Sequence, residues 1–203
     1  MKSFKGFDLS NGLNKALKKI DFRHPTPIQA QAIPLAISGK DILGSAQTGT
    51  GKTAAFSIPL IESLLTTDKS TALVLTPTRE LAKQVLEVIS SLLSDLNHIK
   101  TVCLIGGAQI TQQLKQLKRK PRIIVGTPGR INDHLDRKSL KLNETRFLVL
   151  DETDRMLDMG FGVQIDRILK FVPKNRQTLL FSATIPKEIE RLSSKYLINP
   201  ERV

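Results

Sequence analysis

Three acidic residues follow an apolar segment in the stretch FLVLDETDRM, residues 147–156. Asp151, Glu152 and Asp154 occupy three of the four positions after Leu150, where an apolar strand would end. Acidic side chains at such a place can cap a following helix, or they can hold a metal ion and orient the water that attacks a phosphate. Capping accounts for one acid but does not explain Glu152 directly beside Asp151. The stretch therefore predicts a hydrolytic site if a phosphate-binding element lies elsewhere in the chain.

Such an element is present in AQTGTGKT, residues 46–53. The two inner glycines let backbone N–H groups turn towards phosphate oxygens, and the start of the following helix adds partial positive charge. Ala46 stands where the general phosphate-loop pattern has its first glycine, and a glycine-rich turn without a ligand is the alternative. The expected nucleotide-binding residues of this loop are Ala46, Gln47, Thr48, Gly49, Thr50, Gly51, Lys52 and Thr53.

The two stretches complement each other as halves of one nucleotide-hydrolysing site. Lys52 can reach the β and γ phosphates, and the Thr53 hydroxyl can bind Mg²⁺ together with Asp151, which would act through water. Glu152 would orient and polarise the attacking water. The expected catalytic residues are Glu152, Lys52 and Asp151.

The composition favours a polyanionic partner. Among 203 residues, 31 Lys and Arg stand against 19 Asp and Glu, which gives a net charge of +12. Such an excess favours nucleic-acid binding, although a merely basic soluble surface is the alternative.

Cys103 is the only cysteine, and no histidine has a cysteine at metal-ligand spacing, so a disulfide framework and a Cys/His metal site are excluded. Without a signal-peptide core or an 18-residue apolar run, a cytoplasmic protein with no membrane segment is expected.

Short apolar segments alternate with helical patterns along the chain. The expected strands span residues 41–46, 72–77, 101–107, 122–128, 147–152 and 178–184, and the clearest helices span residues 79–96, 110–119 and 163–172. The strands are nearly continuous in apolar character, which is typical of strands covered on both faces. The pattern predicts an α/β fold with a mostly parallel central sheet and helices on both faces. Ligands of such sheets bind at the carboxyl ends of the strands.

Two helices are expected before the first strand. Ser10 is placed to cap one helix, and Thr26, Pro27 and Gln29 stand at the N-cap, N1 and N3 positions of the next. Pro34 is expected to bend or break that second helix. We interpret residues 1–39 as an N-terminal helical segment and residues 40–203 as the core, together forming one compact domain.

These motifs together resemble the N-terminal RecA-like domain of DEAD-box RNA helicases, a P-loop NTPase domain, from about Phe4 to the end of the chain. The matching segments occur in the family's order: FRHPTPIQ, AQTGTGKT, PTRELA, GG, TPGR, DETD and SAT. Each is a weak signal alone, but seven in order make chance a negligible explanation. Ala46 agrees with the family's own phosphate loop, and Thr153 replaces the alanine of the family's DEAD sequence.

The resemblance implies that segment 1–39 carries the family's adenine-recognising Q motif and that the cofactors are ATP and Mg²⁺. Gln29 is expected to read the adenine edge, for which its amide offers donors and an acceptor. Thr26 is expected to support the phosphate loop and Phe4 to stack on the base. Phe22 and Arg23 belong to the same motif and are expected to contact the nucleotide. The alternative makes Gln29 a plain helix-capping residue.

The resemblance also implies RNA contacts and a coupling element. The expected RNA-binding residues are Pro77, Thr78, Arg79, Gly106, Gly107, Thr127, Pro128, Gly129 and Arg130. Backbone N–H groups, hydroxyls and arginines suit phosphate and ribose contacts, which predicts sequence-independent binding of RNA. Ser182 and Thr184 are expected to couple ATP hydrolysis to strand separation through Asp154, with helix capping near Pro186 as the alternative.

Family members carry a second RecA-like domain with an arginine finger, and no such segment follows Val203. We therefore expect an ATP-binding domain of an ATP-dependent RNA helicase that unwinds short duplexes. The chain alone is expected to be a monomer that binds ATP and RNA weakly and hydrolyses little ATP. An ATP-gated RNA clamp or scaffold without productive unwinding is the alternative. A DNA-translocating motor is disfavoured by PTPIQ and PTRELA.

Overall fold

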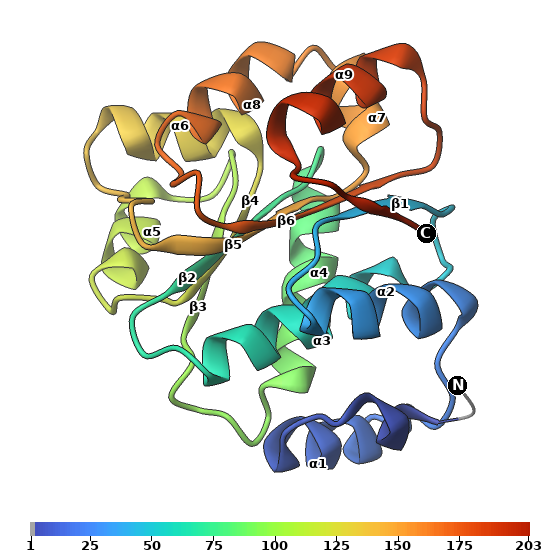
Figure 1. Ribbon diagram of the computed structural model, residues 1–203. Coiled ribbons are helices and arrows are strands. Elements are labelled where there is room, and N and C mark those ends of the chain that lie inside the picture. The colour runs from blue at the N-terminus through green and yellow to red at the C-terminus, as the bar shows by residue number, and fades with distance from the viewer. Residues whose placement is uncertain (1–2) are drawn as a thin grey trace.

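A parallel β-sheet runs through the centre of the molecule (Figure 1). The computed structural model describes residues 3–203, so the first two positions of the segment 1–39 lie outside the described residues. The strands are β1 (Ile42–Ser45), β2 (Thr71–Leu75), β3 (Thr101–Leu104), β4 (Ile123–Gly126), β5 (Thr145–Leu150), β6 (Gln177–Ser182) and β7 (Glu201–Arg202). Their order is β3-β4-β2-β5-β6-β1-β7, and every neighbouring pair is parallel. The predicted α/β fold is therefore confirmed, with the short edge strand β7 as an addition.

Helices cover both faces of this sheet (Figure 1). They are η1 (Phe4–Phe7), α1 (Asn11–Lys19), α2 (Pro27–Ile37), α3 (Lys52–Leu65), α4 (Arg79–Leu92), α5 (Ile110–Leu117), α6 (Pro128–Asp136), α7 (Thr153–Asp158), α8 (Gly162–Leu169) and α9 (Lys187–Tyr196). Within residues 3–203, no helix combines the length and the apolar character that crossing a lipid bilayer requires.

The apolar side chains form one core on each face of the sheet. Because successive strand residues point to opposite faces, Phe147 and Val149 of β5 enter one core while Leu148 and Leu150 enter the other. Helices α1 to α4 contribute to the first core and α6 to α9 to the second. The segment before β1 therefore shares its core with the strands and does not pack separately.

The helix starts follow the capping chemistry of the sequence. The Ser10 hydroxyl accepts a hydrogen bond from the Leu13 amide at the start of α1. At the start of α2 the Gln29 side chain accepts from the Thr26 amide, while the buried Thr26 hydroxyl has no hydrogen-bond partner among the described residues. Pro34 does not break α2, which continues to Ile37. Pro34 lacks only its own N–H donor, and the apolar packing of Ala32, Ile33 and Ala36 at full burial holds the helix together.

Candidate active site and nucleic-acid cleft

The strand order sorts the sequence motifs into two neighbouring groups. The phosphate loop, the acidic motif and the sequence Ser-Ala-Thr follow β1, β5 and β6, which are adjacent in the sheet. The segments expected to contact RNA follow β2, β3 and β4, which are adjacent on the other side. The carboxyl edge of the sheet thus carries a candidate nucleotide half and a candidate nucleic-acid half, which meet where β2 pairs with β5.

The phosphate loop connects β1 to the N-terminus of α3. Gly49 and Gly51 have φ values of 86° and 93°, which glycine adopts without strain. A Cβ atom on Gly51 would also lie 2.5 Å from Nε2 of Gln29, so the position has no room for a side chain. The buried Lys52 donates a hydrogen bond from Nζ to the Ala46 carbonyl oxygen at 2.7 Å, and Thr50 donates to the Gln47 carbonyl. These bonds fold the loop around the lysine.

Gln29 has two contacts, of which only one is a capping contact. Its Oε1 accepts a hydrogen bond from the Thr26 amide at 3.0 Å, and its Nε2 donates to the Gly51 carbonyl oxygen at 3.1 Å. The capping alternative from the sequence is therefore present, and a direct bond to the phosphate loop exists beside it. This position allows Gln29 to connect the segment before β1 with the loop that follows β1.

The aromatic residues of the segment before β1 lie together. Phe4 packs edge-on to Phe7 and tilted against Phe22, with ring centroids 5.6 and 5.9 Å apart. Phe4, Phe22 and Arg23 line a cavity of about 400 Å³, and Gln29 is not among its lining residues. Arg23 forms an ion pair with Asp21, whose φ of 56° lies in the left-handed region that glycine adopts most easily.

Asp151 is a buried carboxylate at the end of β5. Its Oδ1 has no hydrogen-bond partner among the described residues, and burial raises the pKa of Asp151 to about 6, with Lys52 opposing and Glu152 adding to the shift. An unpartnered carboxylate oxygen near a lysine and a phosphate loop fits Mg²⁺, which usually takes one or two carboxylates and completes its shell with phosphates and waters. Within residues 3–203, no group of three or more His, Cys, Asp or Glu side chains is arranged as a metal cage.

Glu152 joins the acidic motif to the phosphate loop. Its backbone is left-handed, with φ 50° and ψ 52°, at the turn from β5 into α7. One carboxylate oxygen accepts a hydrogen bond from the Thr48 hydroxyl at 3.0 Å, and the other forms an ion pair with Arg155 at 3.4 Å. Arg155 is not among the residues expected from the sequence, although its position three residues after Glu152 at a helix start could have indicated the pair.

Thr153 and Asp154 complete the motif. The fully buried Thr153 hydroxyl donates to the Leu150 carbonyl at 3.1 Å, as its side chain predicts. Oδ2 of Asp154 accepts hydrogen bonds from the amides of Ala183 and Thr184 and from the Thr184 hydroxyl, at 3.0 to 3.1 Å. The Asp154 amide in turn donates to the Ser182 hydroxyl at 3.3 Å. Burial alone would raise the pKa of Asp154, but these bonds together lower it.

A cleft of about 580 Å³ lies at the nucleic-acid half. Its lining residues are Pro77, Thr78, Arg79, Glu80, Gly106, Thr127, Gly129, Arg130, Asp133, Met159 and Phe161. Seven of these eleven are expected RNA-binding residues, which shows that the fold brings three separate segments of the chain to one surface. Glu80, Asp133, Met159 and Phe161 are not expected from the sequence, and their only signal is proximity to the motifs along the chain.

Arginines from α4 and α6 border the glycines of this cleft. A Cβ atom on Gly107, whose φ is 76°, would meet the Arg79 guanidinium at 2.1 Å, so the arginine lies directly against the glycine backbone. From the other side, Arg130 donates a hydrogen bond to the Ala108 carbonyl at 3.3 Å and pairs with Asp133 at 3.8 Å. Thr78 and Thr127 stand at the N-caps of α4 and α6. Helix starts and arginines that line a cleft suit phosphate groups.

Comparison with known proteins agrees with this geometry. Residues 26–192 match the DEAD/DEAH box helicase family. The chain is 48% identical over 201 residues to an ATP-dependent RNA helicase CshA of Limosilactobacillus reuteri, covering 98% of this chain and 40% of that protein. It is 48% identical over 204 residues to an ATP-dependent rRNA helicase RRP3 of Debaryomyces hansenii, covering 100% of this chain and 43% of that protein.

The fold comparison gives the same result. A crystal structure of a DEAD box protein from the hyperthermophile Methanococcus jannaschii superposes with a TM-score of 0.94 at 42% identity, over 100% of this chain and 55% of that one. The chain thus spans about two-fifths of the length of the curated relatives above. Because the family model covers most of its length and the phosphate loop meets the acidic motif in space, the chain belongs to the DEAD/DEAH box helicase family.

Proposed function

We propose that this chain is the N-terminal ATP-binding domain of an ATP-dependent RNA helicase, in which ATP binding and hydrolysis drive RNA binding and local separation of short duplexes. The observation that carries the proposal is the hydrogen bond between Thr48 of the phosphate loop and Glu152. It joins the two halves of a hydrolytic site that lie far apart in the sequence. The names of the relatives support the same activity.

Each residue of the nucleotide half has a role that follows from its chemistry. Gly49 and Gly51 expose backbone N–H groups to the phosphates, and Lys52 exchanges its bond with the Ala46 carbonyl for a bond to the β and γ phosphates. Glu152 is released from Thr48 when the loop opens around the phosphates, and it then orients the attacking water. Thr53 and Asp151 would hold Mg²⁺, which supplies positive charge to the phosphates.

The nucleic-acid half binds RNA through its backbone. Arg79 and Arg130 pair with phosphates, while the glycine amides and the hydroxyls of Thr78 and Thr127 contact phosphate and ribose groups. Contact with the 2′-OH makes the binding selective for RNA over DNA without reading the base sequence. We infer that a second RecA-like domain closes over both halves and supplies an arginine finger, worth about three to five orders of magnitude in rate.

The decisive experiment measures RNA-stimulated ATP hydrolysis and displacement of a short duplex by the full-length protein, for wild type and Glu152→Gln. The variant keeps the shape of the side chain but cannot accept a proton from water. We expect a fall in the hydrolysis rate of about a hundredfold or more with unchanged affinity for ATP. Equal hydrolysis by the two proteins would refute the role of Glu152, and ATP-dependent RNA binding without displacement would show an RNA clamp.

A further inference from the structure

A fully buried histidine lies behind the nucleic-acid cleft. His134, in α6, has no exposed surface, and the same helix begins at the Thr127 N-cap that lines the cleft. Neither the nucleotide half nor the cleft uses this ring directly. A neutral imidazole without solvent needs partners for both of its nitrogens, so its hydrogen bonds define what it holds in place.

Two hydrogen bonds in series connect this ring to the residue before the glycine loop of the cleft, and a third bond holds the other ring nitrogen. His134 Nδ1 lies 2.8 Å from the Ser139 hydroxyl, and Nε2 lies 2.9 Å from Oε1 of Gln113 in α5. Gln113, itself buried, donates from Nε2 to the Ile105 carbonyl oxygen at 2.9 Å. Ile105 directly precedes Gly106 and Gly107. The series connects α6 to the loop between β3 and α5 through buried contacts.

The direction of these bonds is fixed by chemistry. The Ile105 carbonyl can only accept, so the Gln113 amide must present its NH₂ group to Ile105 and its oxygen to His134. The imidazole therefore carries its proton on Nε2, and Nδ1 of the neutral ring can only accept. The Ser139 hydroxyl lies 2.8 Å from Nδ1 and 3.1 Å from the His134 carbonyl oxygen, and it shares its one proton between these two acceptors. Burial lowers the pKa of His134, the positive charges of Arg130 and Arg137 add to this effect, and Asp133 opposes it.

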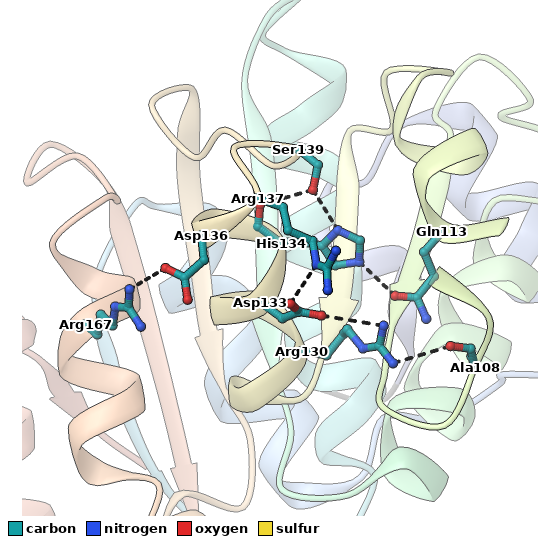
Figure 2. A network of polar contacts seen from close by, with 9 residues as sticks. All are labelled: Ala108, Gln113, Arg130, Asp133, His134, Asp136, Arg137, Ser139 and Arg167. Carbon is teal, nitrogen blue, oxygen red and sulfur yellow. Dashed lines mark hydrogen bonds and ion pairs between the residues drawn. The ribbon is translucent and has the colours of Figure 1, made fainter. Parts of the chain in front are cut away.

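The glycine loop is held on both sides by the same helix. Arg130 donates to the Ala108 carbonyl just after Gly107 (Figure 2). His134 acts through Gln113, which donates to the Ile105 carbonyl just before Gly106. These two contacts fix the ends of the loop, and Arg79 lies against its glycines. Glycines have no side chain to fix their own conformation, so such a loop depends on bonds to its flanks.

We propose that His134 is a positioning residue for RNA binding, which acts through Gln113 to hold the Gly106–Gly107 loop in the conformation that contacts the RNA backbone. This inference rests on the proposed function, because it assigns a supporting residue to the same cleft. The ring itself does not touch RNA. Its loss should weaken RNA binding and leave nucleotide binding intact, since the phosphate loop lies on the other half of the sheet.

Two substitutions at the same position separate hydrogen bonding from packing. His134→Leu keeps an apolar side chain of similar size but removes both bonds. His134→Gln places an amide donor near the position of Nε2 and can still bond to Gln113. With a short fluorescent oligouridylate, we expect the dissociation constant to rise about tenfold for the Leu variant and to stay within about threefold of wild type for the Gln variant. The affinity for a fluorescent ATP analogue should be unchanged in both.

A buried substitution elsewhere provides the stability control. Leu92 is fully buried at the far end of α4, and Leu92→Ala should destabilise the chain at least as much as His134→Leu without weakening RNA binding. If Leu92→Ala weakens RNA binding to the same extent, the effect at His134 reflects lost stability, and the positioning role is refuted.

The backbone amide signals of Gly106 and Gly107 in NMR spectra test the connection without RNA. We expect both signals to shift in His134→Leu, to return towards the wild-type positions in His134→Gln, and the imidazole to show its proton on Nε2. Unchanged glycine signals, or wild-type RNA affinity in the Leu variant, would overturn the proposal. A wild-type chain that binds no RNA would instead count against the proposed function, while the glycine signals would still decide whether His134 positions the loop.

Discussion

Thr153 is the residue at which the acidic motif departs from the family's usual sequence. The position is fully buried, so the extra methyl and hydroxyl of threonine need both space and a partner. The hydroxyl donates to the Leu150 carbonyl within the same turn, and no other residue must move to accept it. The threonine therefore changes contacts only within its own turn. The neighbouring Glu152 keeps its hydrogen bond with Thr48.

Thr153→Ala should lower stability but not nucleotide affinity. The change removes one buried hydrogen bond and one buried methyl group, which together contribute about 1–2 kcal/mol. Thermal unfolding should therefore occur several degrees lower, at about 2–4 °C for each kcal/mol in a chain of this size. Titration with a fluorescent ATP analogue checks the affinity, and a change of more than about threefold would show that Thr153 shapes the site.

Asp151 makes the stability of the metal-free chain depend on pH. Its pKa is raised to about 6 when folded from 3.8 for the free side chain, so between these values the folded state binds more protons. The free energy of unfolding therefore falls as pH rises through this window, by about 3 kcal/mol in total. In EDTA, Asp151→Asn should be more stable than wild type at pH 8 and lose that advantage near pH 4.5. Urea unfolding measures both proteins at both pH values. If the difference in stability between Asp151→Asn and wild type is the same at pH 8 and near pH 4.5, this prediction is wrong.

At the residue scale, the sequence predicts contacts that depend on local order along the chain. The Ser10 cap of α1 and the contact of Gln29 with the Thr26 amide lie within a few residues and are confirmed. The bond of Gln29 to Gly51 and the partners of His134 join segments far apart in sequence. No spacing rule reveals such pairs, because they depend on how the elements pack.

At the scale of elements, α2 combines two roles in one residue. Gln29 accepts from the Thr26 amide with its oxygen and reaches Gly51 of the phosphate loop with its nitrogen. The two roles can be separated because a carboxylate keeps the acceptor and loses the donor. An acidic residue in the first turn also interacts favourably with the helix dipole, so the helix itself should tolerate the change.

Gln29→Glu should therefore weaken ATP binding without unfolding the chain. The lost donor and the repulsion between the carboxylate and the Gly51 carbonyl should lower the affinity for ATP about tenfold or more. Stability should also fall, by about 1–3 kcal/mol, because the buried carboxylate would face the Gly51 carbonyl, and the affinity is therefore measured well below the unfolding temperature of the variant. Gln31→Glu, on the exposed side of the same helix, adds an equal charge as the control. If both variants bind ATP equally well, the contact with Gly51 has no role in nucleotide binding.

The elements themselves were largely predictable, whereas their order in the sheet was not. Six of the seven strands follow from apolar segments bounded by Gly, Pro and polar residues, because buried parallel strands need continuous apolar character. The pairing of β2 with β5 and of β1 with β6 depends on long-range packing. The sequence of a single strand does not show which other strand it will pair with. Pro34 does not break α2, because the packing of α2 outweighs one missing hydrogen bond.

At the scale of the whole molecule, the nucleotide and nucleic-acid halves meet at one strand pair. Leu75 of β2 faces Leu150 of β5, and the Asp151 amide donates to the Leu75 carbonyl at 3.0 Å. The backbone at the carboxyl end of β2, which leads to Pro77 and Arg79, is therefore bonded directly to the residue expected to hold the metal ion. Within the described residues, this pair is where a change at one half most directly reaches the other.

The excess of positive charge predicts strongly salt-dependent RNA binding. For single strands, the logarithm of the binding constant falls with the logarithm of the salt concentration, with a slope of about −0.7 for each phosphate contact. Arg79→Gln should therefore reduce that slope by about 0.7, as measured by fluorescence anisotropy over a salt series. Lys15→Gln, which removes an equal charge from α1 at the opposite end of the molecule, should leave the slope unchanged (Figure 1). Identical slopes for wild type and Arg79→Gln would exclude a phosphate contact by Arg79.

The place of β1 in the sheet has a consequence for synthesis of the chain. Among the strands of this sheet β1 comes first in the chain, yet within residues 3–203 its neighbours are β6 and β7, which come last in the sheet. Strands β2 and β3 both gain a partner when β4 emerges, and β5 then pairs with β2. In contrast, β1 and the phosphate loop have no strand to pair with until residues 177–182 follow. The nucleotide half is thus the last part of the sheet to form. A nascent chain paused before β6 would expose the apolar faces of α2 and α3 and become a substrate for chaperones.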